Sequence, residues 1–221
     1  MPTWNPDQYL KFADERNRPC NDLAAQIRIS NPGRIIDLGC GPGNSTAILA
    51  ERWPDAVIVG LDSSASMIEA ARAAYPEREW VVGNISGWAA AGPGGSEESV
   101  AEGLFDAVFS NAALQWVPDH AVLMPRLLNR VAQGGVLAIQ MPANFDAPAH
   151  QAMRDIASSP RWSGSYPGGR VKEWHVHNPE FYYDVMAPHA SRIDFWRTEY
   201  IHVMAGAEDI VEWYKGTGLR P

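Results

Sequence analysis

A short apolar run that ends in a glycine-rich turn constrains this chain more than any other feature of its sequence. Residues 34–38 read Arg-Ile-Ile-Asp-Leu, and residues 39–43 follow at once as Gly-Cys-Gly-Pro-Gly. Glycine has no Cβ and adopts positive φ readily, so such a turn lets the backbone approach a ligand closely. Residues 44–46, Asn-Ser-Thr, can cap a helix whose N-terminus faces the same place. The pattern therefore predicts a buried strand, a glycine turn and a helix.

Similar apolar runs alternate with helix-like segments over most of the chain. Strands are expected at residues 34–38, 56–61, 80–82, 105–110 and 136–141. Helices are expected over residues 22–29, 44–53, 63–71 and 123–131, the last ending at Gly134-Gly135, with a Gly/Pro/Glu-rich loop over 89–103. Nearly all-apolar strands that alternate with helices predict an α/β fold, a mostly parallel sheet with helices on both faces. In such sheets, ligands bind at the edge formed by the carboxyl ends of the strands.

Two acidic residues indicate which ligand this edge takes. A dinucleotide fingerprint that starts at Gly39 needs glycine at position 44, where this chain has Asn44, so NAD is disfavoured. Asp62 ends the second expected strand, where a carboxylate can accept hydrogen bonds from both hydroxyls of a ribose. Asp37 precedes the turn and places a carboxylate near a cationic or amino-bearing part of the ligand, which a pyrophosphate would not tolerate. The ligand is expected to be a nucleoside.

Charge and composition limit the partners of this ligand site. The chain has 221 residues and a formal charge of -8, with 46% hydrophobic residues and 20% charged ones. It has enough apolar side chain for one domain, and no basic run that would bind nucleic acid. No apolar stretch approaches the ~20 residues that cross a bilayer, and the N-terminus does not read as an export signal, so we expect a cytoplasmic protein without membrane contact. Cys20 and Cys40 have no metal-ligand spacing, so reduced thiols and no metal are expected.

Residues 36–43, together with Asp62 and the Asn84-Ile85 pair, resemble the class I S-adenosylmethionine-dependent methyltransferases. The resemblance implies a Rossmann-like fold and S-adenosyl-L-methionine as cofactor. It implies that Gly39 and Gly41 back the methionine portion, that Asp62 holds the ribose and that residue 84 meets the adenine amino group. The implied cofactor-binding set is Asp37, Gly39, Gly41, Asp62, Met67, Asn84, Ile85 and Asn111. The family usually has Asp at position 84, and an amide there loses a charge-assisted hydrogen bond, so weaker cofactor binding is expected.

Further segments resemble the trans-aconitate 2-methyltransferase family. They are residues 4–6, 9–12, 15–19, 111–120, 140–142, 196–198 and 213–221. The Asn-Ala-x-x-Gln-Trp part of 111–120 also occurs in methyltransferases that esterify a malonyl group on a carrier protein, so that segment alone does not choose between the two. The resemblance would continue past residue 221 through a helical segment and a final antiparallel strand, so both are expected to be missing and the activity of this chain is in doubt.

The resemblance also suggests how a single methyltransferase domain over residues 1–221 is divided. Residues 1–30 are expected to form a helical lid, in which Tyr9, Phe12 and Arg16 share one face of a helix over 7–17. Residues 34–142 are expected to be the cofactor-binding core, 143–189 an insertion over the active site, and 190–221 an incomplete C-terminal strand and helix, the strand covering 192–204.

The leading hypothesis is methyl esterification of a carboxylate of trans-aconitate or a similar small polycarboxylic acid. A carboxylic acid is already ionised at pH 7 and needs no general base, but its binding requires local positive charge. The arginine candidates are Arg16, Arg18, Arg197 and Arg220; the expected catalytic set is Gln115, Trp116, Arg220 and Arg16. Alternatives are another methyl acceptor, such as a carrier-bound malonyl group, or a non-catalytic nucleoside-binding domain. A monomer or small homo-oligomer is expected.

Two histidine features receive plain interpretations. His120, which follows Asp119, is expected to be part of an exposed loop pair, although it is also the candidate general base should the acceptor be an alcohol or an amine. His175 and His177 are two residues apart and have no carboxylates nearby in sequence, so a metal site is not expected there.

Overall fold

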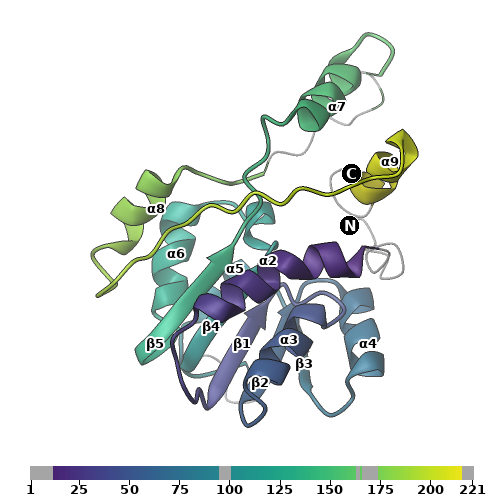
Figure 1. Cartoon of the computed structure of the whole chain (residues 1–221). Helices are drawn as coiled ribbons and strands as arrows, with labels where there is room; N and C mark the ends of the chain where they lie inside the picture. Colours follow the sequence, from purple (N-terminus) through teal and green to yellow (C-terminus); the bar gives the residue numbers. More distant parts are fainter. Residues whose placement is uncertain (1–11, 95–100, 163–164, 166–173, 216–221) are drawn as a thin grey trace.

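The fold is known from a computed structural model, which describes residues 12–94, 101–162, 165 and 174–215 (Figure 1). Its centre is a five-stranded sheet with the strand order β3-β2-β1-β4-β5, in which all neighbouring strands are parallel. The strands are β1 (Arg34–Leu38), β2 (Val57–Asp62), β3 (Glu79–Val82), β4 (Phe105–Asn111) and β5 (Val131–Gln140). The predicted α/β fold is therefore confirmed.

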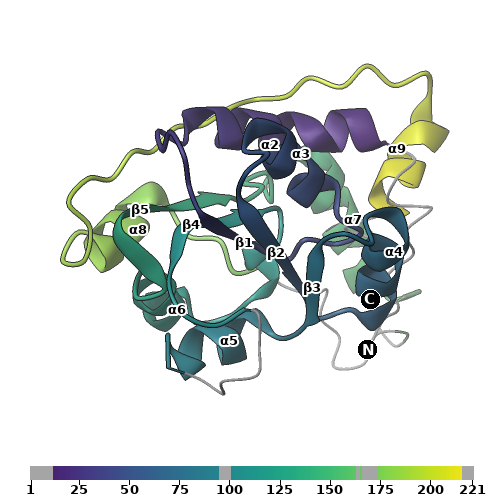
Figure 2. The ribbon, with the colours of Figure 1, turned by 90° about the horizontal axis from the view of Figure 1, so that it is seen from below.

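Helices cover both faces of this sheet (Figure 2). The helices packed on one face are α2 (Ala13–Gln26), α3 (Asn44–Arg52) and α4 (Ala65–Ala74). Those on the other face are α5 (Ile85–Ala91), α6 (His120–Leu128) and α8 (Pro179–Met186). A short 3-10 helix, η1 (Leu114–Trp116), links β4 to α6. Each face has its own apolar core, so the sheet is buried on both sides, as nearly all-apolar strands require.

Successive side chains of the central strands alternate between the two cores. In β4, Ala107 and Phe109 pack in the core under α2 and α3, whereas Val108 packs in the core under α5 and α6. In β5, Ala138 packs on the α2 side and Leu137 on the α5 side. This alternation has the period of two that a strand imposes. It also determines which face receives the last side chain of each strand.

β5 begins earlier than expected, and Gly134-Gly135 lies inside it rather than at the end of a helix. α6 ends at Leu128, and β5 runs from Val131 through both glycines. Gly134 has φ +80°, and a Cβ at Gly135 would lie 2.6 Å from the carbonyl oxygen of Asp106. The register between β4 and β5 shifts at this point. The glycine pair therefore accommodates a bulge in a strand, which the sequence alone does not distinguish from a helix stop.

The helix before β1 is longer at its start than the helix expected over residues 22–29. α2 extends from Ala13 to Gln26, includes Pro19 and ends three residues before the predicted end. Cys20, Leu23 and Ala24 are buried against the sheet. This burial stabilises the helix across the proline, which removes one backbone hydrogen bond. Residues 7–11 of the expected helix over 7–17 lie outside the described residues.

The segment after β5 departs most from expectation. It contains α7 (Pro148–Ser158), α8 and α9 (Ala207–Lys215). The expected strand over residues 192–204 is wrong, because this segment runs as coil past α2 to α9 (Figure 1). A strand needs a hydrogen-bonding neighbour, and among the described residues β5 pairs only with β4. Val203 is accordingly 97% exposed. The expected loop over 89–103 begins only after α5, and its residues 95–100 lie outside the described part.

Candidate active site

The glycine turn after β1 combines two different requirements for glycine. Gly39 has φ +74° and Gly41 has φ +54°. A Cβ at Gly39 would lie 2.2 Å from the Cβ of Ala113, whereas a Cβ at Gly41 would meet no atom within 4 Å. Gly39 is thus needed for the close packing of the segment after β4 against the turn. Gly41 borders open space, as expected of a position that backs a ligand.

Asp62 lies at the end of β2 and holds the glycine turn in place. One carboxylate oxygen accepts the N–H of Gly41 at 3.0 Å, and the other accepts the N–H of Ser64 at 2.8 Å. Burial raises the pKa of Asp62, and the backbone N–H groups partly oppose this rise. Each carboxylate oxygen has more than one lone pair. The side chain therefore retains capacity to accept hydroxyl hydrogen bonds from a ribose.

Asp37 is fully buried and anchors the start of α3. Its Oδ2 accepts the hydroxyl of Ser45 at 2.5 Å and that of Thr46 at 2.7 Å. Its Oδ1 has no hydrogen-bond partner among the described residues. Burial raises the pKa of Asp37 to about 6, although both hydroxyls favour the charged form. The carboxylate therefore positions the helix that follows the turn, and one oxygen is available to a donor.

Asn84 and Ile85, which follow β3, also belong to the expected cofactor-binding set. Asn84 is exposed, and its Oδ1 accepts the N–H of Gly87 at 3.1 Å, so it is the N-cap of α5. The oxygen expected to face an adenine amino group thus has a structural role too. Ile85 and Met67 are buried, and the side chain of Ile85 lies 3.9 Å from a Cβ built on Gly39.

A small cavity of about 20 Å³ lies between α2 and the glycine turn. It is lined by Arg16, Asn17, Cys20, Gly39, Cys40, Asn44, Ser45 and Asn111. Three of the expected site residues, Arg16, Gly39 and Asn111, are therefore together, although they come from α2, the turn and β4. Asn17 and Asn44 were not predicted. Both lie next to predicted positions in the sequence, but an isolated asparagine gives no signal of its own.

The segment after β4 is strained and well anchored. Ala112 has φ +53°, which is unusual for a residue other than glycine and is common at functional sites. The side-chain amide of Gln115 donates to the Ala112 carbonyl at 2.7 Å. Gln115 is buried, and its Oε1 has no partner within the described ranges. The carbonyl of Gln115 accepts the N–H of His175 at 2.8 Å, which links the expected catalytic segment to the insertion.

Aromatic rings from separate segments gather beyond Gln115. The Trp116 ring packs edge-on against Trp174 at 5.5 Å between centroids. Phe145 lies 4.2 Å and His150 5.0 Å from the same Trp174 ring, and Tyr214 of α9 lies 5.1 Å from His150. We call these five residues the aromatic roof. It joins η1, the insertion and α9 by ring contacts.

α9 contacts α2 mainly through Trp213. The Arg16 guanidinium lies 4.7 Å from the centre of the Trp213 ring and donates to the Trp213 carbonyl at 3.1 Å. Phe12 contacts the same ring at 5.3 Å. Of the other arginine candidates, Arg18 lies over the ring of Tyr200, Arg197 is exposed, and Arg220 lies outside the described residues. Arg16 is therefore the candidate that reaches the cavity.

His120 is not the exposed loop residue that the sequence suggested. It is 1% exposed and lies at the start of α6. Its Nε2 lies 3.0 Å from the Leu114 carbonyl and its Nδ1 lies 2.7 Å from the hydroxyl of Tyr182. A carbonyl can only accept, so Nε2 carries the proton and Nδ1 accepts from the tyrosine. Burial lowers the pKa of His120, so it is a neutral link between α6 and α8.

Comparison with known proteins agrees with this geometry. The family described as "Methyltransferase domain" matches residues 9–219. Over 221 residues, the chain is 48% identical to a trans-aconitate 2-methyltransferase of Azoarcus sp. (strain BH72), covering all of this chain and 82% of the relative. It is 43% identical to a trans-aconitate 2-methyltransferase of Yersinia pestis (strain Pestoides F), covering 81% of that protein. The chain belongs to the S-adenosylmethionine-dependent methyltransferases.

A solved structure supports the fold of this methyltransferase. An O-methyltransferase family protein from Burkholderia thailandensis superposes with a TM-score of 0.53 over 78% of this chain and 50% of the other, at 17% identity. The cofactor of the family is S-adenosyl-L-methionine, and the residues present fit it. Gly41 borders open space, Asp62 lies beside it with lone pairs left to accept, and the buried Oδ1 of Asn111 at the cavity has no partner among the described residues.

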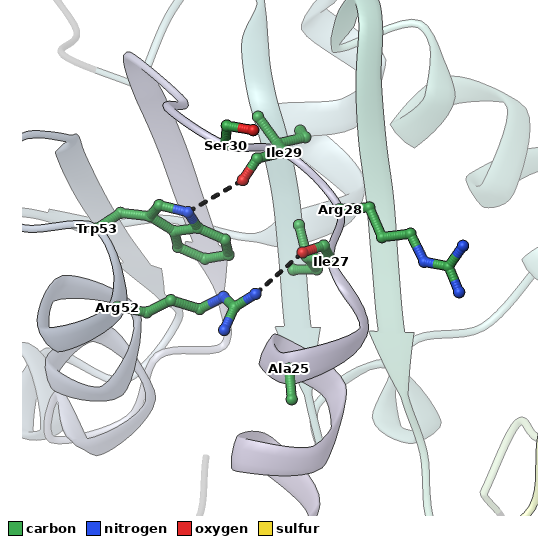
Figure 3. Close-up of a pocket in the computed structure, with 7 residues that line it drawn as sticks. All are labelled: Ala25, Ile27, Arg28, Ile29, Ser30, Arg52 and Trp53. Carbon is green, nitrogen blue, oxygen red and sulfur yellow. Dashed lines mark hydrogen bonds between the residues drawn. The ribbon is translucent and has the colours of Figure 1, made fainter.

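A larger hollow in the methyltransferase lies away from this site. Its volume is about 490 Å³, and it is bordered by the connection from α2 to β1 and by the end of α3 (Figure 3). Arg52 donates to the Ile27 carbonyl and Trp53 to the Ile29 carbonyl, both at 3.2 Å. The end of α3 lies at the amino edge of the parallel sheet, so this hollow is remote from the glycine turn.

The described residues contain no group of three or more side chains suited to hold a metal ion. No helix in the described ranges has the length and apolar character needed to span a bilayer.

Proposed function

We propose that this methyltransferase esterifies a carboxylate of trans-aconitate or a similar small polycarboxylic acid. The observation that carries the proposal is the position of Arg16, whose side chain lines the cavity at the glycine turn. In a chain of net charge -8, an anionic acceptor needs a local cation, and guanidinium groups bind carboxylates in a planar, bidentate manner. The names of the relatives support the same class of acceptor.

The residues of the turn region are proposed to hold the cofactor. Asp62 accepts the ribose hydroxyls, Asn84 faces the adenine amino group, and Gly39, Gly41 and Asn111 border the methionine portion. When bound, S-adenosyl-L-methionine supplies an electrophilic methyl group on a sulfonium, whose sulfur becomes neutral when the methyl group leaves. Asp37 supports this arrangement by holding Ser45 and Thr46 at the start of α3.

The protein is proposed to act by orientation and by exclusion of water. A carboxylate is already a nucleophile at neutral pH, so the chain needs to hold it in line with the methyl group and to remove its hydration. Arg16 holds the anion, and the aromatic roof, which includes Trp116, keeps solvent away from this anion. His120 is buried, neutral and hydrogen-bonded on both nitrogens, which agrees with a reaction that requires no base.

Calorimetry and a transfer assay test the proposal. S-adenosylhomocysteine should bind and NAD should not. Methyl transfer is then measured to trans-aconitate, to related tricarboxylic acids, to monocarboxylic acids and to a carrier-bound malonyl group. Transfer to the free polycarboxylic acids is the expected result. Transfer only to the carrier-bound group, or to an alcohol or amine, would reject the proposed acceptor.

Arg16→Ala should raise the acceptor KM at least tenfold, while the affinity for S-adenosylhomocysteine changes much less. Arg16→Lys should restore the acceptor KM only in small part, since lysine provides charge without the planar guanidinium that binds a carboxylate through two N–H groups. The matched control is Arg28→Ala, an exposed arginine two residues after the end of α2. The rate should vary little between about pH 7 and 9, because the carboxylate has no proton to lose there. A steep rise with pH would instead indicate a general base.

A further inference from the structure

Amide side chains lie at the carboxyl ends of β4 and β5, next to the proposed cofactor site. Asn111 is the last residue of β4 and Gln140 is the last residue of β5, and the two are direct partners in the parallel register. Paired residues of adjacent strands project from the same face. Gln115 lies just past Asn111 in the chain.

The alternation of the strands shows which face the paired amides occupy. Phe109 and Ala138 pack in the core under α2, so Asn111 and Gln140, each two residues further, also project toward α2. Asn111 lines the cavity beside Arg16, in agreement with this assignment. Gln140 is therefore on the same side of the sheet as the guanidinium that is proposed to hold the acceptor.

These amides have buried oxygens that lack hydrogen-bond partners. Among the described residues, no donor reaches Oδ1 of Asn111, Oε1 of Gln115 or Oε1 of Gln140. An unpaired buried acceptor costs roughly 1–3 kcal/mol, so the two on the paired residues Asn111 and Gln140 indicate a site completed by another molecule. The amide of Gln115 is held by its bond to the Ala112 carbonyl. Within the described residues no hydrogen bond holds the side-chain amide of Gln140, so the amide can turn about its last torsion to present either its oxygen or its NH₂ group.

The strand order locates this group relative to the reaction. Under the proposed assignments the adenine and ribose lie over the ends of β3 and β2, and the methionine portion lies between β1 and β4. β5 is the next strand outward. Gln140 is thus on the side of the methyl group opposite to the nucleoside, where the acceptor must approach for in-line transfer.

We infer that Gln140 binds the reacting carboxylate of the acceptor through its side-chain NH₂ group, while Arg16 holds a non-reacting carboxylate. The inference rests on the proposed function. A guanidinium bonded to the reacting oxygen would draw charge from it and weaken it as a nucleophile. A neutral amide donor orients the same oxygen and leaves more of its charge available for attack on the methyl carbon.

Substitutions that retain size but change charge test this role. Gln140→Glu should raise the acceptor KM at least tenfold, because two carboxylates then repel each other, and Gln140→Met should raise it several-fold through loss of the donor. Binding of trans-aconitate to the protein saturated with S-adenosylhomocysteine, measured by calorimetry, should weaken in parallel. The affinity for S-adenosylhomocysteine itself should change less than about twofold. Gln133→Glu, an exposed glutamine of the same strand, makes the same charge change at the other end and is the control.

The outcomes separate this inference from the proposed function. If the unmodified protein methylates carboxylic acids but Gln140→Glu keeps an acceptor KM within about twofold, Gln140 does not bind the acceptor and only this inference fails. An equal loss of cofactor affinity in Gln140→Glu and Gln140→Met would indicate that Gln140 contacts the cofactor, and this result would also reject the inference. If the unmodified protein methylates no carboxylic acid, the proposed function fails first. Should the Glu variant not fold, the Met variant decides by the same KM criterion.

Discussion

The sheet with its glycine turn and the region after β5 are built in contrasting ways. Residues 34–140 form five parallel strands buried between two layers of helices. The described residues between 143 and 215 include the three helices α7, α8 and α9, and α9 has no buried residue. α8 packs in the core through Tyr182, and the other contacts between the regions include rings such as Trp116 with Trp174 and single hydrogen bonds such as Tyr200 to Asp22. The proposed cofactor site is thus part of the core, whereas we expect the aromatic roof to tolerate change without loss of the fold.

The largest effect on stability is expected where the glycine turn packs against the segment after β4. Gly39→Ala places a Cβ 2.2 Å from that of Ala113 at φ +74°, so we expect a loss of about 3 kcal/mol or more in unfolding free energy, measured by urea denaturation. Gly87→Ala is the control, because its Cβ would meet no atom within 4 Å inside α5; it should be neutral or slightly stabilising. Equal stability of the two variants would contradict the close packing at the turn.

The second prediction concerns the buried carboxylate of the core. The pKa of Asp37 is raised from 3.8 to about 6, so between these values the folded chain binds more protons than the unfolded one. Its unfolding free energy should therefore fall by about 2 kcal/mol as the pH rises from ~4 to 6. Asp37→Asn should remove this fall, whereas Asp55→Asn, an exposed aspartate after α3, should retain it. Denaturation series at several pH values provide the measurement, and an unchanged slope in Asp37→Asn would count against a raised pKa.

A smaller effect on stability is expected from the region after β5. Trp213→Ala removes the ring that contacts Phe12, Arg16 and His202, so α9 should separate from α2. We expect the acceptor KM to rise about tenfold, while the unfolding free energy changes by about 1 kcal/mol or less. Trp162→Ala, which removes an exposed ring near the end of α7, is the control. A large loss of stability in Trp213→Ala would contradict the expectation that α9 contributes little to the stability of the parallel core.

The smallest effect is expected at the rim of the cofactor region. Asn84→Asp retains an N-cap for α5 and adds a charge-assisted acceptor for an adenine amino group. The binding free energy of S-adenosylhomocysteine should become more favourable by about 1 kcal/mol, as measured by calorimetry. Asn129→Asp, an exposed residue after α6, should leave it unchanged. If Asn84→Asp binds no more tightly, residue 84 does not contact the adenine.

The amino-acid sequence by itself determined the parallel core. β1 begins and ends as predicted at Arg34 and Leu38, and Asp62 ends β2 as expected, because apolar runs, glycine turns and capping residues are local signals with a defined period. The family resemblance of the glycine turn, together with Asp62 and the Asn84-Ile85 pair, also predicted the cofactor, which the family match confirms. The requirement for glycine at position 39 was predicted for a different reason from the one that the packing against Ala113 reveals.

Only the tertiary structure decided the features that depend on partners distant in sequence. Gly134-Gly135 became a bulge because β4 lies beside it, and His120 became buried because Tyr182 of α8 packs on it. Residues 192–204 have strand-like composition, but they form coil because a strand exists only when a neighbouring strand accepts its hydrogen bonds. The meeting of Arg16 with Trp213, 197 residues apart, likewise has no local signal. Local patterns specify elements, whereas long-range packing specifies which side chains meet above them.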